Sequence, residues 1–128
     1  MTPEEASYVK EWISLGKEDL AVAELIISHS PIMLNSACFH CQQAVEKFFK
    51  AFLVSRKVEF LKTHNLELLR LLCIQEDIGF AEFDVGDYEN YAVRNRYPHD
   101  NEIPDFAQVK VLYSGAFEIL SLVEDIIF

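Results

Sequence analysis

The stretch NSACFHCQQAVEKFFKAFLVS, residues 35–55, decides the fold expected for this chain. Its apolar residues recur every three or four positions, which is the spacing of one face of an α-helix. That face comprises Ala37, Cys41, Ala44, Val45, Phe48 and Phe52. Asn35 or Ser36 has a side chain suited to cap the start of the helix. The stretch therefore predicts a long helix that buries one apolar face.

A second face of this predicted helix is polar and contains His40, Gln43, Lys47 and Lys50. Glu46 lies four residues before Lys50, which is the favourable order for an ion pair along a helix. The chain has a net charge of −10, yet residues 47–96 hold eight of its eleven basic and only eight of its twenty-one acidic residues. The overall charge argues against general coating of nucleic acid. The neutral stretch suits either a local basic site or an ordinary solvated surface of mixed charge.

Helical patterns continue through the rest of the chain. Further helices are predicted over residues 2–28, 65–75 and 82–95, and from residue 104 or 105 to the end. Thr2 and Pro3 suit the start of the first helix, and Thr63 or Asn65 could cap the third. No segment alternates apolar and polar residues as a strand does. The 128 residues therefore predict a single all-α domain over residues 1–128, an up-and-down antiparallel bundle of about five helices.

The composition and the start of the sequence limit the class of protein. Hydrophobic residues make up 51% of the chain, enough for a real core, but no apolar run approaches a membrane span. The start of the chain is acidic and polar, unlike a signal peptide. Cys38, Cys41 and Cys73 lie in apolar stretches, which favours reduced core cysteines. A cytoplasmic protein without a membrane partner is expected.

The grouping of Cys38, His40 and Cys41 invites a zinc interpretation, but the residues do not support it well. The two cysteines lie three positions apart on the predicted helix, whereas His40 points elsewhere and no second cysteine pair follows. No Gly-rich phosphate loop or hydrolase motif is present. Neither a metal nor a cofactor is expected.

Asp19 interrupts the apolar face predicted for the first helix. The other members of that face are Tyr8, Trp12, Leu15, Val22 and Ile26. Because burying an unpaired carboxylate is costly, Asp19 needs a cationic partner if it faces the core. An arginine or histidine from the end of the fourth helix is one candidate. Alternatively, Asp19 lies at the edge of the face and reaches water.

The strongest candidate for chemistry is the run RNRYPH, residues 94–99, where a helix gives way to a loop at Pro98. Arg94 and Arg96 offer planar donors that match phosphate oxygens, and a histidine such as His99 can accept and return a proton near neutral pH. Together they suffice for metal-free RNA cleavage. The alternative is that the arginines pair with nearby acids and His99 is merely solvated. His64 is better explained as a structural histidine beside the cap of the third helix.

Residues 37–51, ACFHCQQAVEKFFKA, resemble the second helix of the HEPN domain family. The resemblance extends to residues 12–20, 62–66 and 91–98, so it covers nearly the whole chain in order. It implies a bundle of about five helices that usually forms a homodimer.

The resemblance also implies a function. Many HEPN proteins are metal-independent endoribonucleases with an arginine, four to six residues and then a histidine, and Arg94 and His99 fit this spacing. The resemblance therefore implies that Arg94 and His99 are catalytic. We also expect Arg96, Lys47 and Lys50 to bind the substrate, and Asp19 to orient an arginine or the histidine. Many small HEPN proteins resemble the toxin of a toxin–antitoxin pair whose partner is a minimal nucleotidyltransferase. Others are proposed to bind nucleotides without cleaving RNA.

Overall fold

Helices account for the regular structure in a computed structural model of the chain, which describes residues 1–30, 32–89 and 104–128. The helices are α1 (Pro3–His29), α2 (Leu34–Ser55), α3 (Leu66–Glu76), the short 3-10 helix η1 (Ile78–Glu82) and α5 (Phe106–Ile127). Residues 86–89 are also helical. The described residues contain no strand, so the predicted all-α class is confirmed.

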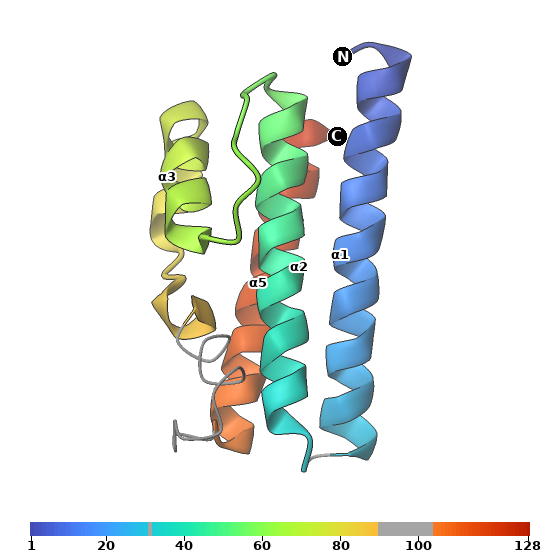
Figure 1. Ribbon diagram of the computed structural model, residues 1–128, viewed down its shortest axis with the longest axis vertical. Coiled ribbons are helices and arrows are strands. Elements are labelled where there is room, and N and C mark those ends of the chain that lie inside the picture. The colour runs from blue at the N-terminus through green and yellow to red at the C-terminus, as the bar shows by residue number, and fades with distance from the viewer. Residues whose placement is uncertain (31, 90–103) are drawn as a thin grey trace.

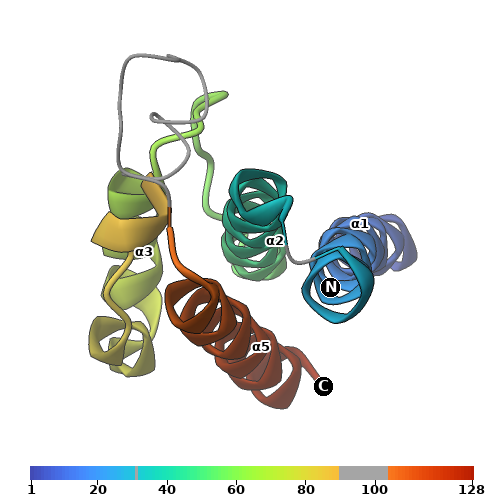
Figure 2. The same cartoon turned by 90° about the horizontal axis from the view of Figure 1, so that it is seen from below.

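The long helix α2 lies at the centre of the bundle. Figure 1 shows α1 and α2 side by side and antiparallel, and these two helices make the most extensive contact in the fold. Viewed along the bundle, α2 lies between α1, α3 and α5 (Figure 2), and it contacts each of them. The α5 helix also contacts α1 and runs in the same direction as α2, from the lower end to the upper end of Figure 1.

The face predicted for α2 is confirmed, because all six of its apolar residues are fully buried. The adjoining side of α2 is buried as well, since Phe49 also has no exposed surface. Phe49 and Phe52 both pack against Phe80 of η1, with ring centroids 5.9 and 4.6 Å from it. A helix that is enclosed on nearly every side anchors the rest of the bundle.

Two of the predicted helix caps are present and one is wrong. The Thr2 hydroxyl accepts a hydrogen bond from the Glu5 backbone N–H, and the Asn65 side chain accepts one from the Leu68 N–H. The α2 helix instead begins at Leu34 after Met33, which has no side-chain cap bond. Asn35 and Ser36 therefore lie inside the first turn, where they cannot act as the N-cap.

The apolar face predicted for α1 is wrong by about one residue along the helix. The buried face comprises Val9, Ile13, Gly16, Leu20, Ala23 and Ile26, together with Asp19. Tyr8 and Leu15 are about half exposed, at 49% and 48%. The reason is close packing on α2: a β-carbon added at Gly16 would lie 2.5 Å from a ring carbon of Phe48. A glycine thus marks the contact that larger residues would block.

The predicted helix over residues 82–95 begins later than expected, at residue 86, and its part from residue 90 lies outside the described residues. The backbone at Phe83 is extended, with φ −96° and ψ 131°. Arg70 of α3 holds the chain there, because its guanidinium donates hydrogen bonds to the backbone carbonyls of Ala81 and Phe83.

By length and composition α5 would suit a membrane span, with a mean hydropathy of 1.3 over its most apolar window. The expectation that no apolar run approaches the length of a membrane span is therefore wrong. One face of α5 is buried in the bundle, where Val109, Ala116 and Val123 have no exposed surface. Its contacts with α2 and α1 account for this part of its apolar character.

The three cysteines are buried as free thiols, as predicted. Burial raises the pKa of the Cys38 and Cys41 thiols to about 12, from 9.0, and raises the pKa of Cys73 as well. At Cys41 the smaller causes are the neighbouring Cys38 and Asp19.

We expect this burial to make stability depend on pH above 9. Between pH 9 and pH 12 the thiols ionise in the unfolded chain but stay neutral in the folded one. Each thiol should then lower the free energy of unfolding by about 1.4 kcal/mol per pH unit. Urea denaturation at pH 8.5 and pH 10.5 measures this loss. A Cys38→Ala, Cys41→Ala variant should lose less stability over the same interval, and an equal loss would contradict the explanation.

Candidate functional site

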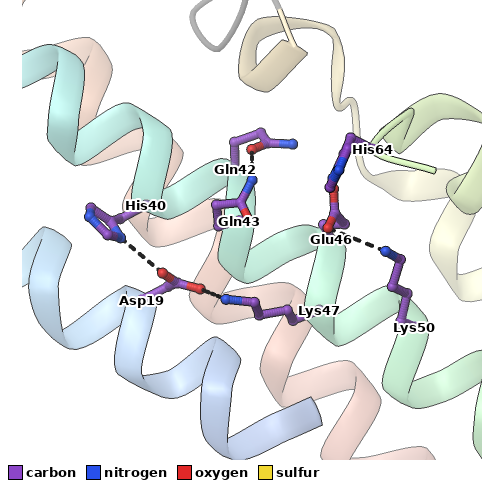
Figure 3. Close-up of polar contacts among 8 residues, drawn as sticks. All are labelled: Asp19, His40, Gln42, Gln43, Glu46, Lys47, Lys50 and His64. Carbon is purple, nitrogen blue, oxygen red and sulfur yellow. Dashed lines mark hydrogen bonds and ion pairs between the residues drawn. The ribbon is translucent and has the colours of Figure 1, made fainter. Parts of the chain in front are cut away.

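Two ion-pair networks, each centred on a carboxylate, lie along one side of α2 (Figure 3). The first is centred on Asp19 of α1. One of its oxygens lies 2.8 Å from Nδ1 of His40, and the other accepts a hydrogen bond from the Lys47 ammonium. Because a carboxylate accepts, Nδ1 of His40 carries the proton. Asp19 is only 8% exposed, so the Lys47 ammonium supplies the cation that its burial requires, and His40 adds a hydrogen bond.

The second network is centred on Glu46 of α2. Its Oε2 lies 3.3 Å from the Lys50 ammonium, which confirms the pair predicted from the sequence, and its Oε1 lies 2.8 Å from Nδ1 of His64. Glu46 and Lys50 are 3% and 6% exposed. His64 belongs to the connector between α2 and α3 and has a largely exposed side chain. The carboxylate therefore joins a buried lysine to a histidine at the surface.

A cavity of about 740 Å³ opens beside the Glu46 network, and we call it the Trp12 cavity. Its aromatic lining residues are Tyr8, Trp12 and Phe60. Its lysines are Lys47, Lys50 and Lys62, and its carboxylates are Glu46 and Glu59. These residues come from α1, from α2 and from the connector that follows α2. The volume is within the range of small-molecule binding pockets.

Lys50 joins the aromatic and charged parts of this lining. Its ammonium lies 5.4 Å from the ring centroid of Trp12 and 5.9 Å from that of Phe60. Both distances are within the range of cation–π attraction. Lys50 is thus held by two rings and by Glu46, while Lys47 is held by Asp19. Among the described residues, Lys62 lines the cavity without an ion pair.

The structure brings together only some of the residues predicted for the site. Lys47 and Lys50 both line the cavity, and Asp19 is bonded to Lys47. The catalytic candidates Arg94 and His99, with Arg96, lie outside the described residues. A partner for Asp19 from that segment lies outside them as well. Within the described part, the alternative of an Asp19 that reaches water is wrong, because α2 covers it.

Tyr8, Trp12 and Phe60 line the cavity, although the sequence patterns did not predict this. The helical spacing and large side chains of Tyr8 and Trp12 predict instead that both lie on the buried face of the first helix. Phe60 lies in a connector for which no role was predicted. The useful signal was the neighbouring pattern of Val9, Ile13 and Gly16, which leaves Tyr8 and Trp12 on another side of α1.

With this geometry established, comparison with known proteins identifies the family. The family model described as the HEPN domain matches residues 9–126, nearly the whole chain. The chain belongs to the HEPN domain family. Searches of curated proteins and of solved structures gave no match. The HEPN match spans both networks, the lysines of the Trp12 cavity and the run from Arg94 to His99.

Proposed function

We propose that this HEPN protein is a metal-independent endoribonuclease and the toxin of a toxin–antitoxin pair. The observation that carries the proposal is the spacing of Arg94 and His99, with four residues between them, in a chain that belongs to the HEPN family. These residue types match the chemistry of RNA cleavage without a metal ion. A histidine moves the proton, and an arginine stabilises the phosphate.

In the proposed reaction the 2′-hydroxyl of a ribose attacks the adjacent phosphate. His99 removes the hydroxyl proton, and Arg94 stabilises the negative charge that develops on the phosphate oxygens. Arg96 adds a second cation beside the phosphate. The bond between phosphorus and the 5′-oxygen of the next nucleotide breaks, and this oxygen takes up a proton from water. The products are a 2′,3′-cyclic phosphate and a free 5′-hydroxyl.

The Trp12 cavity supports an RNA or nucleotide ligand, because lysines and aromatic rings share its wall. Lys47 and Lys50 are proposed to attract the phosphate backbone. Asp19 accepts hydrogen bonds from His40 and Lys47, so its proposed part in binding is to hold Lys47 in place. The net charge of −10 argues for a local contact of this kind over a broad basic surface.

We propose a homodimer and an antitoxin partner of the minimal nucleotidyltransferase type. In a homodimer with two-fold symmetry the two copies present the same surface to each other. Two sets of Arg94 and His99 could then act at one cleft. The acidic balance outside residues 47–96 suits a protein partner better than RNA.

A second candidate function is a nucleotide-binding module that does no chemistry, and the Trp12 cavity is the observation that favours it. Its volume of about 740 Å³ suits a single nucleotide, and lysines and aromatic rings from α1, α2 and the connector line it. In this case the protein would bind a nucleotide at α1 and α2, and RNA would survive incubation with it.

Incubation of the purified protein with RNA in EDTA tests the proposed function. We expect cleavage that persists without divalent metal and leaves 2′,3′-cyclic phosphate ends, which mass spectrometry of the products would identify. Intact RNA, together with saturable binding of a mononucleotide, would favour the nucleotide-binding module. Cleavage abolished by EDTA would contradict the metal-independent mechanism.

A further inference from the structure

One ring nitrogen of His64 is held by a buried carboxylate. Its Nδ1 lies 2.8 Å from Oε1 of Glu46 (Figure 3), and the Glu46 side chain is only 4% exposed. Because a carboxylate accepts, Nδ1 carries a proton and donates a hydrogen bond to Glu46. The ring then gains and loses a proton at its other nitrogen, Nε2. Glu46 thus fixes both the orientation of the ring and the atom at which it exchanges protons.

His64 also lines the Trp12 cavity and is open to solvent. Its side chain is 71% exposed, and it is the only histidine in the described lining of the cavity. Lys47, Lys50 and Lys62 share this lining and attract a phosphate group. Histidine is the side chain that ordinarily changes its charge between pH 5 and pH 8. A phosphate ester drawn to these lysines therefore lies beside a group suited to proton transfer.

The structural role predicted for His64 does not account for its position. The start of α3 is held by the two neighbours of His64. The Asn65 side chain accepts a hydrogen bond from the Leu68 N–H, and the Thr63 hydroxyl accepts one from the Asn65 N–H. His64 instead turns to Glu46 of α2, which is already paired with Lys50. A carboxylate that orients a histidine in this way is a recurring part of sites where the histidine moves a proton.

We propose that His64 passes a proton to the leaving 5′-oxygen during RNA cleavage, and that Glu46 is its positioning residue. This inference rests on the proposed function, in which the RNA backbone lies at Lys47 and Lys50 of the same cavity. As the bond between phosphorus and the 5′-oxygen breaks, Nε2 gives its proton to this oxygen. The ring then takes a proton from water, while His99 releases to water the proton that it took from the 2′-hydroxyl. Both histidines thereby return to their starting states.

An RNA with sulfur in place of the 5′-oxygen at the mapped cleavage site tests this step. A thiolate leaves without a proton, so cleavage of this RNA does not need His64. In single-turnover reactions with EDTA, we expect His64→Asn to cleave the ordinary RNA about 10²–10⁴ times more slowly than wild type. The same variant should cleave the sulfur-containing RNA at the wild-type rate. His99→Ala should be slow on both, because its proposed role is at the 2′-hydroxyl.

Asparagine at position 64 separates proton transfer from a purely structural contact. Its amide N–H takes the place of Nδ1–H and still donates to Glu46, but the amide does not exchange a proton with the substrate. Since the His64 side chain is largely exposed, the fold should survive, and circular dichroism checks this. His29→Ala is the control: it removes an exposed histidine at the end of α1, outside the cavity lining, and should cleave both RNAs as wild type does.

Failure of this inference is distinguishable from failure of the ribonuclease proposal. A wild-type rate of His64→Asn on the ordinary RNA would reduce His64 to a structural contact. Equal slowing on both RNAs would exclude His64 from the departure of the 5′-oxygen. Either result overturns the inference and leaves the ribonuclease standing. Ordinary RNA left uncut by the wild-type protein would overturn the ribonuclease and this inference together.

Discussion

Glu46→Ala is expected to lower the free energy of unfolding by about 3–5 kcal/mol, the usual cost of leaving one member of a buried ion pair without its partner. Lys50 is 6% exposed, and its described ionic partner is Glu46, 3.3 Å away. The rings of Trp12 and Phe60 still face its ammonium and offset part of the loss. Urea denaturation followed by circular dichroism measures the change.

Two matched variants test whether the lost pairing is the cause. Glu46→Leu combined with Lys50→Met removes both charges and keeps apolar volume, so it should recover most of the stability. His64→Ala removes the other partner of Glu46, but this side chain is 71% exposed, and the loss should stay below about 1 kcal/mol. If the double variant were as unstable as Glu46→Ala, packing of the side chain would be the cause instead.

The centre of the fold could be predicted from sequence because α2 carries a strong and regular signal. Its apolar spacing gave the correct buried face, and the spacing of Glu46 and Lys50 gave the correct ion pair. The face of α1 could not be predicted in the same way. Gly16 contributes nothing to an apolar count, yet it sits directly under Phe48. Large residues such as Tyr8 dominated the pattern although they lie outside the buried face.

The cavity depends on tertiary contacts that no local pattern contains. Trp12 and Phe60 are forty-eight positions apart and meet at Lys50 only because α1 and the connector both lie against α2. The partners of Asp19 also depend on tertiary contacts. Sequence reasoning established that a buried carboxylate needs a cation, but the identity of that cation depended on which face of α2 turned toward α1.

His99→Ala is expected to lower the rate of RNA cleavage by a factor of about 10²–10⁴, the usual contribution of a general acid–base residue. Arg94→Ala removes a donor to the developing negative charge and should cost about 10²–10³. Arg94→Lys keeps the charge but loses the planar pair of donors, so it should recover only part of the rate. Single-turnover cleavage of a labelled RNA in EDTA measures all three.

The combination of these variants tests whether Arg94 and His99 act on one phosphate. When two residues serve the same chemical step, removing either one removes most of the rate. The double variant should therefore be little slower than the slower single variant. His29→Ala is the matched control, because this exposed histidine ends α1 and lies outside the lining of the Trp12 cavity. Independent effects that multiply would place the two residues in separate roles. A wild-type rate in His99→Ala would remove the histidine from the chemistry and contradict the proposed mechanism.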